Sequence, residues 1–403
     1  MTSIAQQPEG GRKGPALEVL LVFLKLGVSC FGGPVAHIGY FRTELVERRR
    51  WLDERSYVDL VALCQFLPGP ASSQVGIGAG LLRAGVPGAL AAWVGFTLPS
   101  AIAMVLFAYG VDSLESALGA GWLHGLKIAA VAVVAQAVWG MAQSLAPDRE
   151  RATLAVLATI VALTFPTAWG QIGAIVLGAV AGLIVLPRAA APQGSDLVVP
   201  IGRAFAVTCA ALFFILLIGL PVVAAATHDH ALELVASFYR SGSLVFGGGH
   251  VVLPLLQASV VPPGWISNDA FLAGYGAAQA VPGPLFTFSA YLGAAMTPAP
   301  NGWLGAIICL VAVFLPSFLL VFGALPFWAQ LRDRPAAQTA LRGVNAAVVG
   351  LLLAALYKPV WTSAIERPAD FALGVTAFLL LAMWRVPPWL VVVLAAVAGQ
   401  LIG

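Results

Sequence analysis

Long apolar runs, separated by short clusters of charged residues, restrict the fold of this chain more than any other feature. The runs are roughly 16 to 27 residues long, and a helix needs roughly 20 apolar residues to cross the hydrocarbon core of a membrane. Only 10% of the 403 residues are charged, against about 25% in an average soluble domain. We therefore expect an all-α polytopic membrane protein, and we exclude a soluble enzyme, a nucleic-acid-binding protein and a disordered scaffold.

The chemistry-bearing residues do not form the signature of an enzyme. The four cysteines lie singly inside apolar runs, without the paired spacing of metal ligands, so we expect reduced thiols in the core. The sequence contains no nucleotide-binding loop, no His-Glu cluster and no nucleophile motif. We expect no cofactor, no metal site and no enzymatic activity.

The chain contains two similar halves. The residues from Ala16, ALEVLLVFLKLGVSCFGG, match those from Ala231, ALELVASFYRSGSLVFGG, at an offset of 215. Later matches keep the same order and nearly the same offset: WLDERSY with WISNDAF, CQFLPGP with AQAVPGP, TLPS with FLPS, and LHGLK with LRGVN. Such self-similarity indicates an internal repeat. We predict a first repeat over 16–190, a linker with one extra helix over 191–230, and a second repeat over 231–403.

Each half is expected to contain six apolar segments, with one unmatched segment between the halves. The expected segments are 16–31, 56–82, 87–109, 122–144, 152–167, 170–187, then 204–226, then 231–246, 270–297, 303–329, 340–357, 369–384 and 387–402. The total is about 13. Because each half has an even number of segments, the one extra crossing between them gives the second half the opposite orientation in the bilayer. Such inverted repeats are common among secondary transporters.

The basic residues indicate that some segments are broken hairpins. Arg12 and Lys13 precede the first segment, and several arginines from Arg42 to Arg55 follow it. Because cytoplasmic loops carry the excess of Lys and Arg, both groups are cytoplasmic only if 16–43 enters the membrane and returns, turning at 31–34. Segment 56–82 would turn in the same way at Pro-Gly-Pro, 68–70. We expect a cytoplasmic N-terminus, and we assign Arg385 to a cytoplasmic loop.

Four cations lie inside apolar segments: Lys25, Lys127, Arg240 and Arg342. Each costs roughly 2.5 to 3.5 kcal/mol to place near the membrane centre. The repeat pairs Lys25 with Arg240, so these two side chains could converge on the pseudo-two-fold axis and hold one divalent oxyanion. The alternative is that both extend to a membrane interface.

The repeat also suggests a second anion site and a few carboxylates for coupling. Arg342 stands opposite His124, and Asn345 opposite Lys127. These four residues form a secondary candidate site. The alternative for Lys127 and Arg342 is again that they extend to a membrane interface. The candidate coupling carboxylates, for which a structural role is the alternative, are Glu18, Glu233 and Asp59.

The Gly-rich and Pro-Gly-Pro turns add neutral donors to the candidate site. Glycines let backbone amides approach a ligand closely, and the helix after each Pro-Gly-Pro turn points its positive end toward the turn. Helix kinking alone is the alternative, although the turns occur twice. The candidate residues are Gly32, Gly33, Gly247, Gly248, Gln65, Gly69, Gln279, Gly283, Ser72 and Thr287.

Two pairs of motifs resemble a known family. FGGP at Phe31 with QFLPGP at Gln65, and FGGGH at Phe246 with QAVPGP at Gln279, are similar to signatures of the chromate ion transporter family in its long, two-domain form. The resemblance covers nearly the whole chain. It is specific to the family but not to the substrate. Gly249 replaces the proline of FGGP in the second half, so the two turns need not be equivalent in function.

The resemblance implies an inner- or plasma-membrane protein that exports chromate and confers resistance to it. It implies chromate as the partner, with sulfate as its structural analogue, in contact with membrane lipid and with no nucleic acid; a homodimer is a further expectation. A dianion that leaves a cell at about −100 mV gains roughly 4.6 kcal/mol, which favours export by alternating access. The alternatives are a sulfate or other oxyanion permease, an anion channel, and a lipid-handling membrane protein.

Overall fold

The structure is a computed structural model that describes residues 14–188 and 199–402. This part of the chain is helical and contains no strand. Six helices are long and apolar enough to cross a membrane, and four shorter apolar helices accompany them. The prediction of an all-helical, multi-pass membrane protein is confirmed. Arg12 and Lys13, on which the orientation argument partly rests, lie outside the described residues.

The described part of the chain contains the following helices, in chain order. Before the central helix they are α1 (Ala16–Ser29), α2 (Gly33–Arg42), η1 (Thr43–Arg48), α3 (Glu54–Phe66), α4 (Ala71–Leu118), α5 (Gly121–Leu145), α6 (Arg149–Thr164) and α7 (Ala168–Val185). The central helix is α8 (Arg203–Thr227). After it come α9 (His230–Ser243), η2 (Gly249–Val251), α10 (Val252–Val260), α11 (Asn268–Ala278), η3 (Leu285–Thr287), α12 (Phe288–Ala295) and α13 (Gly302–Ala324). The last elements are η4 (Leu325–Phe327), α14 (Trp328–Arg332), α15 (Pro335–Ala355), η5 (Leu356–Trp361), α16 (Thr362–Ala364), α17 (Pro368–Ala382) and α18 (Pro388–Ile402).

The helices break at the turns that the sequence predicts. A gap at 30–32 separates α1 from α2, and a gap at 67–70 separates α3 from α4. In the second half, α9 ends before the Gly-rich turn, and α11 ends before the second Pro-Gly-Pro turn. Glycine and proline end helices because one adopts backbone angles that other residues avoid and the other lacks an N–H.

Helix α4 contains a further reversal. Ala84 and Gly85 have non-helical backbone angles, and a Cβ atom built on Gly80 would overlap the carbonyl oxygen of Gly88. Residues eight apart in a straight helix are about 12 Å apart, so the arms 71–83 and 86–118 must fold back on each other. This reversal agrees with the prediction of separate segments at 56–82 and 87–109.

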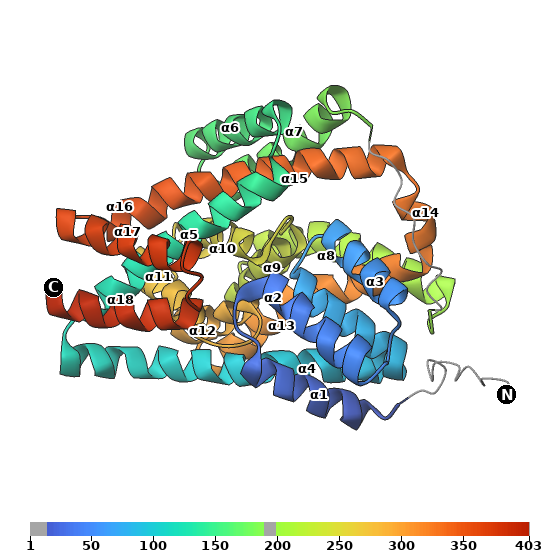
Figure 1. Ribbon diagram of the computed structural model, residues 1–403, viewed down its shortest axis with the longest axis horizontal. Helices are drawn as coiled ribbons and strands as arrows, with labels where there is room; N and C mark the ends of the chain where they lie inside the picture. Colours follow the sequence, from blue (N-terminus) through green and yellow to red (C-terminus); the bar gives the residue numbers. More distant parts are fainter. Residues whose placement is uncertain (1–13, 189–198, 403) are drawn as a thin grey trace, which may run out of the picture.

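Helices from the first and the second half of the chain pack against one another. α5 contacts α11, α15, α17 and α18, and α15 also covers α6 and α7. The long helices α4 and α15 run along opposite sides of the molecule in Figure 1, with α17 and α18 at one end and α3 and α14 at the other. The central helix α8 exposes large apolar side chains, including Phe214, Ile215 and Ile218. Such a continuous apolar surface suits contact with lipid.

Candidate functional site

Turns from the two halves hydrogen-bond to each other, and they do so twice. The N–H of Gly283 donates to the carbonyl oxygen of Cys30 at 2.9 Å, and the N–H of Gly69 donates to the carbonyl oxygen of Val245 at 2.6 Å. Gly283 and Gly69 are the central residues of the two Pro-Gly-Pro turns, whereas Cys30 and Val245 precede the two Gly-rich turns. Each Pro-Gly-Pro turn therefore binds the Gly-rich turn of the other half.

The glycine of each Pro-Gly-Pro turn also fits against a serine of the other half. A Cβ atom built on Gly283 would lie 2.9 Å from Ser100 Oγ, and one built on Gly69 would lie 2.9 Å from Ser317 Oγ. The two glycines have φ angles of 95° and 127°. Both the backbone conformation and the close approach thus require glycine.

We expect Gly283→Ala to destabilise the protein by about 1–3 kcal/mol, because alanine would strain the positive φ and press on Ser100 and the carbonyl oxygen of Phe96. The midpoint of thermal unfolding of the purified protein in detergent measures the effect. Gly39→Ala is the matched control, since Gly39 lies on α2 with open space around it. Equal midpoints for the two variants would contradict the close fit at Gly283.

A cavity of about 470 Å³ opens beside the first of these crossings, within the size range of about 300–1,000 Å³ that is usual for ligand sites. Its lining comes from the Gly-rich turn of the first half, α5, the second Pro-Gly-Pro turn and the connection between α17 and α18. The lining residues are Phe31, Gly32, Gly33, Pro34, Tyr40, Val133, Gln136, His250, Ala278, Gln279, Val281, Gly283, Leu285, Leu381, Arg385, Val386, Pro387, Pro388 and Trp389. This lining contains one arginine and one histidine, and it contains no aspartate or glutamate.

The polar groups of the cavity suit an anion. The side-chain nitrogen of Gln279 is buried and has no aligned acceptor among the described residues. Helix α2 begins at Gly33, so its unpaired amides and positive dipole end lie at the lining. His250 hydrogen-bonds through Nδ1 to the hydroxyl of Tyr275 at 2.8 Å. The site thus offers hydrogen-bond donors and positive charge.

Four of the predicted site residues, Gly32, Gly33, Gln279 and Gly283, line this cavity. The two paired cations do not. Lys25 is exposed on α1, next to the exposed side chain of Leu24, and Arg240 donates a long hydrogen bond to Ser259 Oγ at 3.4 Å. The cavity and this cation pair are therefore separate candidates for an anion site.

The other turn residues do not line this cavity. Gln65 is exposed, Ser72 Oγ is 3.3 Å from His37 Nδ1, and Thr287 donates to the carbonyl oxygen of Pro284 at 2.9 Å. Gly247 lies beside Asn345 and Met141, and Gly248 lies beside Met141.

The four residues of the secondary site are spread over separate contacts. Lys127 forms an ion pair with Asp269 at 3.1 Å, and His124 Nε2 is 3.0 Å from the buried carboxylate of Asp370. Arg342 donates to the carbonyl oxygen of Pro187 at 3.2 Å, and Asn345 Oδ1 has no partner among the described residues. Lys127 and His124 thus each face a carboxylate rather than an open pocket. Asp370, which the sequence did not single out, has no exposed side-chain surface.

The three candidate coupling carboxylates also have partners. Asp59 binds Arg332 and Trp328 of α14, at 2.8 and 2.9 Å. Glu233 lies 3.5 Å from His230. In this conformation Asp59 thus binds side chains of α14, and Glu233 lies beside a histidine of its own helix.

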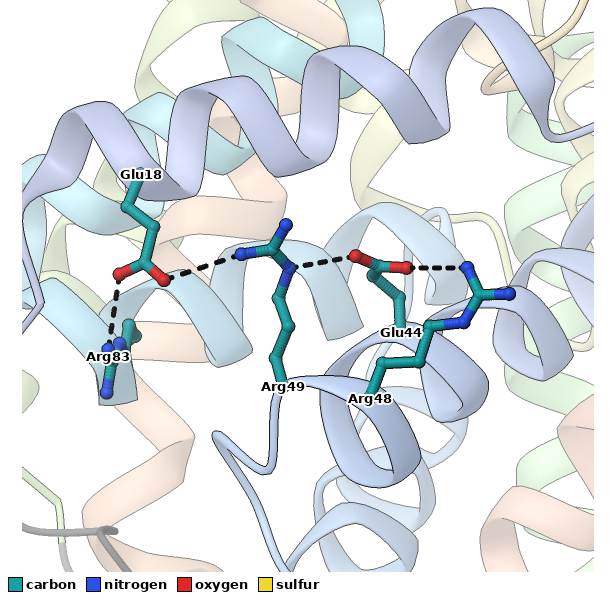
Figure 2. A network of polar contacts seen from close by, with 5 residues as sticks. All are labelled: Glu18, Glu44, Arg48, Arg49 and Arg83. Carbon is teal, nitrogen blue, oxygen red and sulfur yellow. Dashed lines mark hydrogen bonds and ion pairs between the residues drawn. The ribbon is translucent and has the colours of Figure 1, made fainter.

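Glu18 belongs to a polar network that joins α1, η1 and α4 (Figure 2). It accepts from Arg83 at 3.1 Å and from Arg49 at 3.5 Å, and Arg49 also reaches Glu44 at 2.8 Å. Burial alone would raise the pKa of Glu44, but hydrogen bonds from Arg49 and Arg48 hold that pKa below its usual value. The network therefore ties the start of the first hairpin to the reversal in α4.

Sequence reasoning missed Arg385, which we had assigned only to a cytoplasmic loop and which lines the cavity. A signal was present. Arg385 stands between two short apolar segments and directly precedes Val386-Pro387-Pro388, a proline-rich break of the kind that marks the other turns.

Comparison with known proteins identifies a family. The profile described as "Chromate transporter" matches residues 17–184 and again 232–400. The chain is 29% identical to the chromate transport protein of Pseudomonas aeruginosa over 88% of its length and 83% of the relative's. It is 27% identical to the probable chromate transport protein of Synechococcus elongatus, covering 94% and 93% of the two chains. It is also 27% identical to the chromate transport protein of Cupriavidus metallidurans, over 95% of this chain and 92% of the relative. No solved structure matches the chain.

Proposed function

Because this chain belongs to the chromate transporter family, we propose that it exports chromate from the cytoplasm by alternating access and thereby confers chromate resistance. The family consists of transporters, so the chain is not an enzyme. We further propose that the anion binds in the cavity between the Gly-rich turn at 31–34 and the Pro-Gly-Pro turn at 282–284.

The observation that carries this proposal is the charge of the cavity lining. It combines Arg385, the amide of Gln279 and the first turn of α2, and it lacks any carboxylate. Transporters commonly bind their substrates where broken helices meet near mid-membrane, with helix N-termini pointing at anionic groups. Sulfate has the charge and shape of chromate, so we propose that it competes for the same cavity.

We propose that the two halves are inverted repeats that rock against each other around this site. The reciprocal hydrogen bonds of Gly283 to Cys30 and of Gly69 to Val245 support this proposal, because residues at equivalent places in the repeat exchange equivalent bonds. Movement of one half against the other would have to change these crossings, so we propose that they take part in controlling access to the cavity.

The membrane potential favours export. Moving two negative charges outward at about −100 mV yields roughly 4.6 kcal/mol, enough for a gradient of roughly a thousandfold or more. We place the protein in the inner or plasma membrane with a cytoplasmic N-terminus, since the arginines of the loop after η1 would then face the cytoplasm.

Chromate accumulation in everted membrane vesicles tests the function. We expect saturable, energised accumulation that excess sulfate reduces and that Gln279→Leu lowers roughly tenfold or more, because a hydrogen bond to the charged anion is lost. Lys25→Ala and Arg240→Ala serve as the comparison and should have much smaller effects.

Two results would contradict the proposal in different ways. Flux without saturation would indicate a channel. Accumulation that Lys25→Ala and Arg240→Ala abolish but Gln279→Leu leaves unchanged would move the binding site from the cavity to the cation pair.

A further inference from the structure

Helices α17 and α18 form a hairpin of two short apolar helices. Each helix has 15 residues, about 22 Å at 1.5 Å per residue, which is too short to cross a core of about 30 Å. In Figure 1 the two helices lie at one end of the molecule, and their linking turn points toward α2. The rings of Trp389 and Phe31 are 6.1 Å apart. The tip of this hairpin therefore meets the Gly-rich turn of the first half.

Arg385 occupies the tip in an unusual conformation. Its φ is 54°, a left-handed conformation that favours glycine over residues with a side chain. The turn is closed by the N–H of Val386, which donates to the carbonyl oxygen of Leu380 at 3.0 Å. The neighbouring Gln136 on α5 donates to the carbonyl oxygen of Leu381 at 3.2 Å and so fixes the tip from the side. Backbone that is strained but held in this way is common where a side chain has a function.

Arg385 is also the strongest positive group at the cavity. Among the described residues it forms no ion pair or side-chain hydrogen bond, and neither lysine nor a second arginine lines the cavity. By contrast, Lys127 pairs with Asp269, and Arg240 and Arg342 are hydrogen-bonded elsewhere. The buried amide nitrogen of Gln279 belongs to the same lining, so a neutral donor and a guanidinium lie at one cavity.

We propose that Arg385 contacts the transported divalent oxyanion and sets the charge selectivity of the cavity, with Gln279 as its neutral partner. This inference rests on the proposed function. A guanidinium presents two parallel N–H donors to two oxygens of a tetrahedral oxyanion, which a lysine cannot do. Arg385 would thus supply the positive charge at the anion site that the repeat predicts for Lys25 and Arg240.

The test combines binding and transport in the full-length protein. Arg385→Gly removes the side chain and relieves the positive φ, so the variant should fold at least as well as the wild type. We expect chromate to raise the unfolding temperature of the purified wild-type protein, and we expect Arg385→Gly to lose this rise and to lower vesicle transport roughly tenfold or more. Arg385→Lys should retain part of both signals.

Arg50→Gly is the matched control, because Arg50 is also exposed and has a φ of 52° but does not line the cavity. It should behave like the wild type in both assays. An Arg385→Gly protein that keeps the chromate-dependent shift and transport would overturn this inference and leave the proposed function intact. A wild-type protein that responds to neither chromate nor sulfate would overturn the proposed function itself, and this inference with it.

Discussion

Asp59→Ala is expected to lower the free energy of unfolding by about 3–5 kcal/mol, the usual effect of removing one partner of a buried ion pair. The carboxylate of Asp59 is 5% exposed and accepts from Trp328 Nε1 and from Arg332 Nη1. Arg332 is only 8% exposed. Alanine would leave this guanidinium in the interior without its main counter-charge.

Unfolding of the purified protein by heat and by a titration with sodium dodecyl sulfate would measure the loss. The control is Glu54→Ala on the same helix, because the pair of Glu54 with Arg42 is half exposed and solvent-exposed pairs contribute little. In the double variant Asp59→Ala/Arg332→Ala, we expect a loss smaller than the sum of the two single losses, since no unpaired charge remains. Strictly additive losses would show that the pair does not act as a unit.

The same double variant separates a structural role from proton coupling. If Asp59 only joins α3 to α14, protein that folds without the pair should still transport chromate. Energised transport that is lost while the fold is kept would instead make Asp59 a coupling group.

The positions of the helix breaks could be predicted because they depend on local chemistry. At the four turns, clustered glycine and proline end the helices, because one favours non-helical backbone angles and the other lacks an N–H. The prediction therefore located the gap at 67–70 and the gap before Gly33. The candidate residues Gly32, Gly33, Gln279 and Gly283 follow from the same motifs.

Which turn binds which could not be predicted. A repeat shows which residues occupy equivalent places in the two halves, but equivalent residues need not contact each other. Gly69 and Gly283 are equivalent, but they do not bind each other: each binds the residue that precedes the Gly-rich turn of the opposite half. Likewise, the pairing of Lys25 with Arg240 predicts symmetry and says nothing about the face on which either side chain lies. On α1 the buried residues include Val22 and Leu26, whereas Lys25 is exposed. Leucine and valine occupy both the buried and the exposed sides of this run, so its apolar residues give little amphipathic signal of the difference.

We expect Gly125→Leu to lower the free energy of unfolding by about 3 kcal/mol or more, at the upper end of overpacking effects. We also expect it to abolish transport. A Cβ atom built on Gly125 would overlap the carbonyl oxygen of Ala395, and one built on Gly399 would lie 2.5 Å from the Cα atom of Gly125. The backbones of α5 and α18 are thus in contact through small residues, as in close helix pairs within membranes. Leucine would push α18 away and displace the tip that carries Arg385.

Gly140→Leu on the same helix is the matched control, because Gly140 is exposed and has open space around it. The unfolding midpoint in detergent and chromate uptake by everted vesicles should both fall for Gly125→Leu and change little for Gly140→Leu. The overlap at Gly125 is with the backbone of α18. A smaller side chain on α18, as in Gly125→Leu/Ala395→Gly, should therefore restore neither the unfolding midpoint nor chromate uptake. Full recovery in that double variant would show that side-chain packing, rather than the spacing of the two backbones, holds the hairpin tip at the cavity.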